Sequence, residues 1–326
     1  MPEIKAPLVA TIQITGHCNL DCLYCFSFPC PRIDMSKHSV HRIIDEFFKA
    51  EVFRIELSGG EPFLHPDILE FIEHLAENPI GLACAISSNG IPFTDRNLAR
   101  NVAKVIRRLQ KEDDGIVPLQ ISLDSPMPEI NDKVRGKTKD VITGIRNLLE
   151  ENVPICLAVV IHAQNIRTAD NIIDFFYPQI KNFHFMNIMP SIKSAKNGTN
   201  SWLKPNQHDI SSFWQYLEKR ISIDFPEARI SSPMDEIGIL KKRSLLTESI
   251  SCHRCTAGFT RIAVTPDLKV IPCVLSRNII MGDLSSHSFN EIWNSTTAEH
   301  IRSLRQNPCQ ISIESFMENK QTAAIM

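Results

Sequence analysis

Three cysteines near the start of the chain have the spacing of a metal site. Cys18, Cys22 and Cys25 form a C-x3-C-x2-C run directly after an apolar segment. A structural zinc site is closed by four protein ligands, and an electron-transfer iron–sulfur cluster usually has four cysteines. Three cysteines therefore indicate a cluster with one open iron that binds a reacting molecule. A zinc or other structural site is the alternative for this run taken alone.

A second group of cysteines lies near the end of the chain. A C-x2-C pair with two distant cysteines can complete the coordination shell of an iron–sulfur cluster, and it equally suits a four-cysteine zinc site. The spacing alone leaves both alternatives open. The members of this group are Cys252, Cys255, Cys273 and Cys309.

The composition argues against several classes of function. The chain has 326 residues, 43% of them hydrophobic, and a formal charge of −2. The balanced charge gives no basic footprint for a nucleic acid or an anionic membrane. No apolar run is long enough to span a bilayer, and residues 1–5 lack the features of a signal peptide. We therefore expect a cytoplasmic protein with no nucleic-acid or membrane partner, in which the cysteines bind metal rather than form disulfides.

Short apolar segments alternate with helical periodicity from residue 9 to about 190. The segments are rich in β-branched residues and bounded by Gly, Pro, Ser or Asn, which predicts strands. Between them, apolar residues recur every three or four positions, as at Leu98, Val102 and Val105. The predicted strands are Val9–Thr15, Phe53–Leu57, Leu82–Ser87, Leu119–Leu123, Ile155–Ile161 and Phe183–Ile188.

These repeated units predict an α/β fold with a partial (β/α)6, TIM-like barrel, because a closed barrel needs about eight units. Ligand chemistry is then expected at the carboxyl ends of the strands. We predict a barrel domain over 1–190, a linker and helical bridge over 191–250, and a small α+β domain over 251–326. The last of these contains a hairpin, Thr260–Val264 and then Lys269–Ile271.

Short motifs follow the predicted strands in a fixed order. After the second strand comes Ser58-Gly59-Gly60-Glu61-Pro62, after the third Ser88-Asn89-Gly90, after the fourth Ser122-Leu123-Asp124, and then Arg135-Gly136. Each motif alone is no more than a turn signal. Together with the cysteine run, and with Tyr24 just before its third cysteine, the order resembles the radical S-adenosylmethionine (radical SAM) superfamily.

The resemblance implies a role for each motif. Cys18, Cys22 and Cys25 would hold a 4Fe–4S cluster whose open iron chelates SAM. One electron would then cleave SAM to methionine and a 5′-deoxyadenosyl radical, which takes a hydrogen atom from a substrate. The implied SAM-binding residues are Gly59 and Gly60 through their backbone, Glu61 for the ammonium group, Arg135 for the carboxylate, Ser122 and Asp124 for the ribose, Tyr24 near the adenine, and Pro62, Ser88 and Asn89 beside them.

The C-terminal group resembles the SPASM and twitch extensions of radical SAM enzymes. In those extensions, cysteines flank a β-hairpin, and a Gly-Asp stretch leads to a helix bearing Ile-Trp. Gly282-Asp283 and Ile292-Trp293 fit this pattern, whereas Leu268 replaces the glycine usual in the hairpin turn. A full SPASM domain needs more cysteines than the group provides, so we expect a twitch-like domain in which Cys252, Cys255, Cys273 and Cys309 hold one auxiliary 4Fe–4S cluster.

The resemblance implies a radical SAM enzyme of the oxidoreductase type. We predict peptide modification of the kind that matures ribosomal peptides, with small-molecule (sugar- or aminoglycoside-like) dehydrogenation or epimerisation as the alternative. A non-catalytic metal-binding scaffold with a zinc site is the alternative from another class. A flavodoxin- or ferredoxin-type protein would donate the electron, and Cys30 and Cys309 are candidate thiols for returning a hydrogen atom to the substrate.

Overall fold

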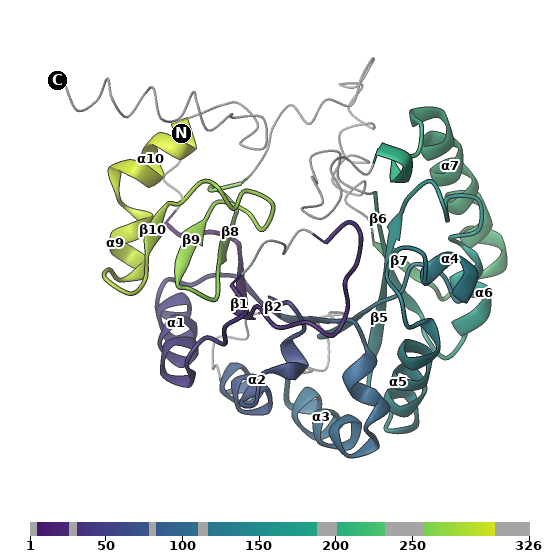
Figure 1. Ribbon diagram of the computed structural model, residues 1–326, viewed down its shortest axis with the longest axis horizontal. Helices are drawn as coiled ribbons and strands as arrows, with labels where there is room; N and C mark the ends of the chain where they lie inside the picture. Colours follow the sequence, from purple (N-terminus) through teal and green to yellow (C-terminus); the bar gives the residue numbers. More distant parts are fainter. Residues whose placement is uncertain are drawn as a thin grey trace.

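The computed structural model describes residues 5–25, 31–77, 83–109, 117–187, 201–231 and 257–303. The strands in these residues form one curved sheet (Figure 1), ordered β10-β9-β8-β1-β2-β3-β4-β5-β6-β7. From β8 to β7 all neighbours are parallel, whereas β9 and β10 are antiparallel additions at one edge. The strands are β1 (Val9–Thr15), β2 (Arg54–Gly59), β3 (Ala83–Ser88), β4 (Leu119–Ser122), β5 (Ile155–Ile161), β6 (Asn182–Asn187), β7 (Arg229–Ser231), β8 (Arg261–Val264), β9 (Lys269–Ile271) and β10 (Gly282–Asp283).

The crossover helices lie outside the curved sheet, so its concave face is turned towards the middle of the molecule (Figure 1). This arrangement is the one expected for right-handed β-α-β crossovers in a barrel. The helices are α1 (Lys37–Lys49), α2 (Ile68–Ala76), α3 (Arg96–Leu109), α4 (Pro128–Asn131), α5 (Thr138–Glu150), α6 (Asn171–Phe176), α7 (Gln207–Asp224), α9 (Phe289–Trp293) and α10 (Thr296–Ser303), with 3-10 turns η1 (Pro62–Leu64), η2 (Ile91–Thr94) and η3 (Ser201–Leu203).

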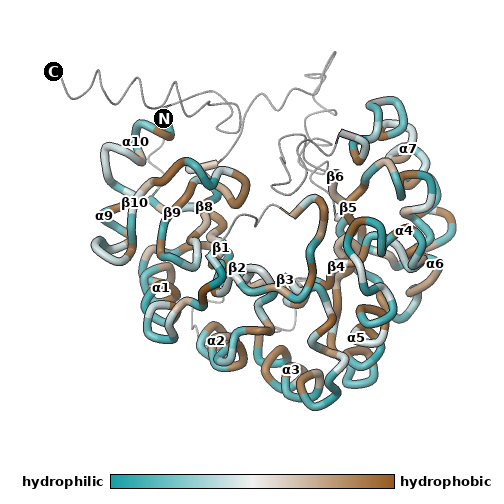
Figure 2. The backbone as a smooth tube through the Cα atoms, viewed as in Figure 1, coloured by the Kyte–Doolittle hydropathy of each residue, from teal (hydrophilic) through white to brown (hydrophobic). Residues whose placement is uncertain are grey.

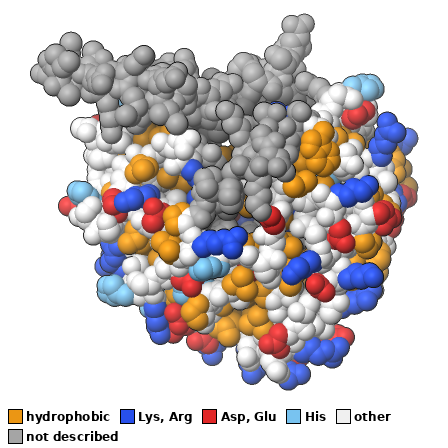
Figure 3. Space-filling model, viewed as in Figure 1, with side chains coloured by type: hydrophobic (Ala, Val, Ile, Leu, Met, Phe, Trp, Pro, Cys, Tyr) orange, Lys and Arg blue, Asp and Glu red, His pale blue; other side chains and the backbone are white. Residues whose placement is uncertain are grey.

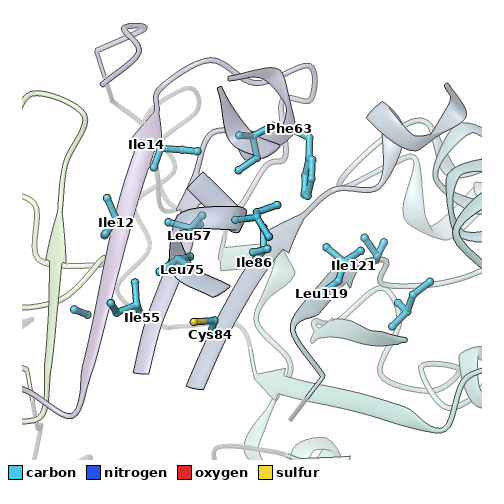
Figure 4. Packing of buried hydrophobic residues seen from close by; sticks show 14 of the residues in the cluster. Ile12, Ile14, Ile55, Leu57, Phe63, Leu75, Cys84, Ile86, Leu119 and Ile121 are labelled. Carbon is cyan, nitrogen blue, oxygen red and sulfur yellow. The ribbon is translucent and has the colours of Figure 1, made fainter. Parts of the chain in front are cut away.

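Alternation along the strands separates the two faces of the sheet. On β1, Ala10, Ile12 and Ile14 are fully buried in the core between sheet and helices. Figure 4 shows Ile12 and Ile14 packed in one layer with Leu57 and Ile86. Burying an aliphatic side chain of this size contributes about 1.5–3 kcal/mol. Figure 2 marks hydrophobic residues along the backbone in brown, and several of these segments lie in the strands.

The partial barrel predicted from the sequence is confirmed. The six predicted strands correspond to β1–β6, with ends displaced by at most a residue or two. One further strand, β7, lies in the stretch predicted as a linker and helical bridge, and it pairs in parallel with β6. A strand of three residues is too short to show a period, so it could not be predicted from the pattern of apolar residues.

The C-terminal hairpin continues the barrel sheet. The predicted hairpin, Thr260–Val264 and then Lys269–Ile271, corresponds to β8 and β9. Strand β8 pairs in parallel with β1, with Val9 opposite Arg261 and Ile12 opposite Val264. In the hairpin turn Leu268 has φ +66°, the left-handed conformation that glycine would adopt more easily. The division at residues 190 and 250 stays a prediction.

The Gly-Asp and Ile-Trp motifs of the C-terminal region lie in contact, on β10 and α9. A Cβ atom on Gly282 of β10 would lie 2.6 Å from Ile292 Cγ1 of α9, so a larger residue cannot stand there without displacing the Ile292 side chain. Trp293 is buried beside Ile292 in the core. The spacing of these signals therefore reflects close packing of one strand on one helix.

On the face seen in Figure 3, acidic and basic side chains are interspersed. No helix in the described part of the chain is both long enough and apolar enough to cross a bilayer.

Candidate active site

The cysteine loop leaves the carboxyl end of β1 and is fastened where it begins. Thr15 Oγ1 donates a hydrogen bond to Asp34 Oδ1 at 2.5 Å, and Gly16 N donates to Ile33 O at 2.9 Å. A Cβ atom on Gly16 would lie 1.8 Å from Pro31 O, so only glycine fits. These contacts hold the start of the cysteine run against the edge of the sheet.

Cys18, Cys22 and Cys25 are partly buried and have free thiols. Burial raises the pKa of the Cys22 thiol to about 12, although the charge of Arg135 acts in the opposite direction. Burial also raises the pKa of Cys18. Buried thiols of this kind become thiolates when a metal ion compensates their charge.

The surroundings of Cys18 suit an iron–sulfur cluster. Leu20 N donates to Cys18 Sγ at 3.4 Å, and Asn89 Nδ2 donates to the same sulfur at 3.8 Å. Such donors stabilise the negative charge of a cluster-bound thiolate. Across the described ranges, no three His, Cys, Asp or Glu side chains are grouped so as to hold a single metal ion. A cluster allows wider spacing, because each cysteine binds a different iron.

The glycine motif after β2 packs against the cysteine loop. Gly60 N donates to Thr15 O at 2.8 Å, and Glu61 N donates to His17 O at 2.7 Å. A Cβ atom on Gly60 would lie 2.1 Å from His17 O, and one on Gly59 would lie 2.4 Å from Thr15 O. Both glycines are thus needed for contact between the two loops. Their approach to SAM stays a prediction.

Glu61 is fully buried and holds the end of β3 in place. Its Oε1 accepts from Ser88 Oγ at 2.8 Å and from Phe63 N at 3.1 Å, and its Oε2 accepts from Asn89 N at 2.6 Å. Burial raises the pKa of Glu61 to about 7, despite these three donors. Asn89 in turn donates from Nδ2 to Asn19 Oδ1 at 2.7 Å, which links β3 to the cysteine loop.

Asp124, at the carboxyl end of β4, is also fully buried. Its Oδ1 accepts from Val160 N at 3.0 Å and from Arg135 Nη1 at 3.3 Å, and its Oδ2 accepts from the Tyr24 hydroxyl. His162 Nε2 lies 3.6 Å from the same Oδ2. Burial alone would raise the pKa of Asp124, but Arg135, His162 and Tyr24 outweigh it and lower the pKa below its ordinary value.

Arg135 completes this group. Its Nη1 donates to the Tyr24 hydroxyl at 2.7 Å, and its guanidinium carbon lies 5.7 Å from the centre of the Tyr24 ring. The sequence predicted that Tyr24, Asp124 and Arg135 would contact three different parts of SAM. The structure brings them into contact with one another, and their contacts with SAM stay predictions.

Sequence reasoning missed two asparagines of this site. Asn131 Oδ1 accepts from Asp124 N, and Asn165 Nδ2 donates to Asp124 O, both at 3.0 Å. Each asparagine follows a strand that ends at the same edge of the sheet. That position in the sequence was the one feature that could have marked them as site residues. Nothing in their spacing showed that both would fix the backbone of Asp124.

The remaining predicted site residues lie nearby or outside the described residues. Ser122 ends β4 and is half-buried, and Pro62 begins η1 and is buried. Cys273 is half-buried shortly after β9. The cysteines that lie outside the described residues are Cys30, Cys252, Cys255 and Cys309.

Two family models match this chain, and each match contains cysteines of one of the two groups. The model of the radical SAM superfamily matches residues 12–176, and the model of the SPASM iron–sulfur cluster-binding domain matches residues 255–312. The first match covers half of the chain. It runs through the cysteine loop, Glu61 and Asp124.

Curated relatives match along most of the chain. The mycofactocin maturase MftC of Mycobacterium tuberculosis is 25% identical over 93% of this chain and 74% of its own length. A probable GTP 3′,8-cyclase of Methanocaldococcus jannaschii is 27% identical over 81% of this chain and 84% of its own. The PqqA peptide cyclase of Rhodopseudomonas palustris is 22% identical over 90% of this chain and 74% of its own.

Among solved structures, SuiB of Streptococcus suis superposes with a TM-score of 0.71 at 17% identity, over 91% of this chain and 68% of that one. The likeness supports the fold. The two family matches imply SAM and a 4Fe–4S cluster as cofactors, with auxiliary iron–sulfur in the C-terminal region. The chain therefore belongs to the radical SAM superfamily and carries a C-terminal SPASM domain.

Proposed function

We propose that this chain is a radical SAM maturase that modifies a peptide. The observation that carries the proposal is that the similarity to MftC and to the PqqA peptide cyclase extends over 93% and 90% of the chain. Coverage of that extent reaches beyond the barrel into the C-terminal region.

The chain's residues would hold and shield the reactants. When bound, the cluster and SAM supply one-electron cleavage of SAM and a 5′-deoxyadenosyl radical that removes a hydrogen atom from the substrate. Cys18, Cys22 and Cys25 would bind the cluster. Glu61 and Asp124 help to fix the position of the cysteine loop through hydrogen bonds, Glu61 N to His17 O and the Tyr24 hydroxyl to Asp124.

We further propose that the second cysteine group holds one auxiliary 4Fe–4S cluster. The SPASM match, described as an iron–sulfur cluster-binding domain, favours this over a zinc scaffold. The proposed ligands are Cys252, Cys255, Cys273 and Cys309.

Metal content and SAM cleavage test the core of the proposal. The full chain is reconstituted anaerobically, its iron, sulfide and zinc are measured, and 5′-deoxyadenosine is followed with SAM and dithionite. We expect about eight irons per chain, about four of which depend on the first cysteine group, and 5′-deoxyadenosine formation that requires this group. About four irons with zinc would make the C-terminal site structural, and zinc alone would refute the radical mechanism. A Cys18→Ala/Cys22→Ala/Cys25→Ala variant is the control.

The substrate class needs its own experiment. Peptides encoded beside the gene and GTP are supplied separately to the reconstituted enzyme, and products are identified by mass spectrometry. A mass change in a peptide that requires SAM supports the maturase. Turnover of GTP without any change in a peptide would contradict it.

Small-molecule chemistry is the second candidate, because the similarity to a probable GTP 3′,8-cyclase also covers most of the chain. Reaction in deuterated water separates its two outcomes. Solvent deuterium at the reacting carbon without loss of two hydrogens would indicate epimerisation, with Cys30 or Cys309 as the donor thiol. Loss of two hydrogens without deuterium would indicate dehydrogenation.

A further inference from the structure

A side-chain amide on β1 links the two cysteine-bearing regions, and within the described part of the chain its nitrogen has no hydrogen-bond partner. Gln13 lies on the strand that leads into the cysteine loop, and it is fully buried. Arg277, in the segment after Cys273, donates from Nη2 to Gln13 Oε1 at 2.8 Å. Gln13 Nε2 is buried and has no hydrogen-bond partner among the residues that the structure describes.

Arg277 determines which end of the amide faces it. A guanidinium group can only donate hydrogen bonds, so the amide oxygen of Gln13 must point to Arg277. The opposite orientation would bring two donors together. The amide nitrogen is therefore directed away from Arg277, and its orientation is set by a residue from the C-terminal region.

The amide lies on the concave face of the sheet. Its neighbours on β1, Ile12 and Ile14, point into the layer between sheet and helices (Figure 4), so Gln13 points to the other face. The hydroxyls of Thr11 and Thr15 share that face. They donate to carboxylates, Thr11 to Glu56 at 3.0 Å and Thr15 to Asp34 at 2.5 Å, and neither is a partner of Gln13 Nε2.

A buried N–H group without an acceptor costs free energy, and a folded protein keeps such a group where a ligand supplies the acceptor. Gln13 lies two residues before the end of β1, where the cysteine loop begins, and it contacts Arg277 of the segment after Cys273. We propose that Gln13 donates a hydrogen bond from Nε2 to a carbonyl-type oxygen of the substrate. Arg277 is then a positioning residue that orients this donor.

The inference rests on the proposed function and names the chemistry that the site recognises. The oxygen belongs either to a peptide-bond carbonyl or to a carboxylate. Both are acceptors without a hydrogen, and two probes distinguish them: N-methylacetamide as a neutral amide and acetate as an anion.

The first test uses the metal-free full chain labelled with 15N. The side-chain amide resonance of Gln13 is identified by its absence in Gln13→Glu, and each probe is titrated. We expect this resonance to shift and saturate with one probe. A saturating response to N-methylacetamide indicates a peptide carbonyl, and one to acetate indicates a carboxylate. In Arg277→Met the response should weaken severalfold, because the amide can rotate. No saturating response to either probe would overturn the proposal.

The second test separates a binding role from a structural one. Gln13→Glu keeps an oxygen for Arg277 but replaces the donor with an acceptor. Its midpoint of urea unfolding should stay unchanged or rise, while KM for a peptide that the wild type modifies should rise roughly ten- to a hundredfold with kcat little affected. The matched control is Gln120→Glu, on the same face, because Gln120 Oε1 accepts from Ser87 Oγ at 3.3 Å.

The outcomes distinguish this inference from the proposed function. A lowered unfolding midpoint with an unchanged KM in Gln13→Glu would assign Gln13 a structural role and overturn the inference. If the wild type forms no 5′-deoxyadenosine, the proposed function fails, whereas the probe titration still reports on Gln13.

Discussion

Glu61 and Asp124 are two fully buried carboxylates on either side of the cysteine loop, and the protein stabilises them differently. Within the described residues Glu61 accepts hydrogen bonds only from neutral donors, among them Ser88 Oγ and Asn89 N. Burial raises its pKa to about 7, although the charge of Arg135 acts in the opposite direction. Asp124 is equally buried, yet the nearby Arg135 guanidinium and hydrogen bonds lower its pKa below the ordinary value.

The difference shows that neutral hydrogen bonds can position a buried carboxylate without fully compensating its lost hydration. A neighbouring cation does compensate it. The contribution of Glu61 to the free energy of unfolding should therefore change with pH near neutrality. The contribution of Asp124 should depend on the presence of Arg135. Each prediction below concerns the metal-free full chain, so that cluster loss does not obscure the result.

The largest effect is expected for Asp124→Asn. It leaves Arg135, whose side chain is only 11% exposed, without its carboxylate, so the free energy of unfolding in urea at pH 7 should fall by about 3–5 kcal/mol. The double variant Asp124→Asn/Arg135→Met removes both charges and should recover part of the loss. A cost below that of Glu61→Gln would contradict the role of charge at this site.

The fold could be predicted from the sequence further than the site could. Segments such as Val9–Thr15 and Ile155–Ile161 are apolar, β-branched and bounded by turn residues, and both proved to be strands with the predicted bounds. The cysteine and glycine motifs are short continuous runs of the chain, so they too could be identified from the sequence. In contrast, the parallel pairing of β8 with β1 joins segments about 250 residues apart, and no local pattern encodes it.

The contacts of the site residues depend on this long-range geometry. Tyr24 and Asp124 are 100 positions apart in the chain, and their hydrogen bond arises because the cysteine loop crosses to the end of β4. The family resemblance implies a separate contact with SAM for each, and those contacts stay predictions. The contact between them follows from burial, because a buried carboxylate needs a hydrogen-bond partner within the protein.

The second prediction concerns the pH dependence of stability. Between pH 4.5, the ordinary pKa of a glutamate, and the raised pKa of Glu61 at about 7, the folded chain keeps the Glu61 proton that the unfolded chain has released. Stability should therefore fall as pH rises through this window, by on the order of 3 kcal/mol from this group. Urea titrations from pH 4 to pH 8 measure it. The slope should disappear in Glu61→Gln and persist in Asp124→Asn.

The third prediction is the cost of Glu61→Gln at pH 5, where the wild-type carboxyl is protonated. In either orientation the amide nitrogen faces a backbone N–H, of Phe63 or of Asn89. One donor then loses its acceptor, so the free energy of unfolding should fall by about 1–3 kcal/mol. At pH 8 the deficit should shrink, because the wild type then bears a buried charge. An equal deficit at both pH values would argue against the raised pKa.

The smallest effect is expected for Ser88→Ala, and it tests whether neutral donors matter to Glu61 at all. Ser88 Oγ donates to Glu61 Oε1 and accepts from Gly90 N at 3.0 Å, while Phe63 N continues to serve Oε1 in the variant. The free energy of unfolding should fall by about 1 kcal/mol. Because one donor to the ionised form is lost, the pKa of Glu61 should rise further, and the pH window of decreasing stability should extend upwards. Ser87→Ala, at the adjacent position on β3, is the matched control and should leave that window unchanged.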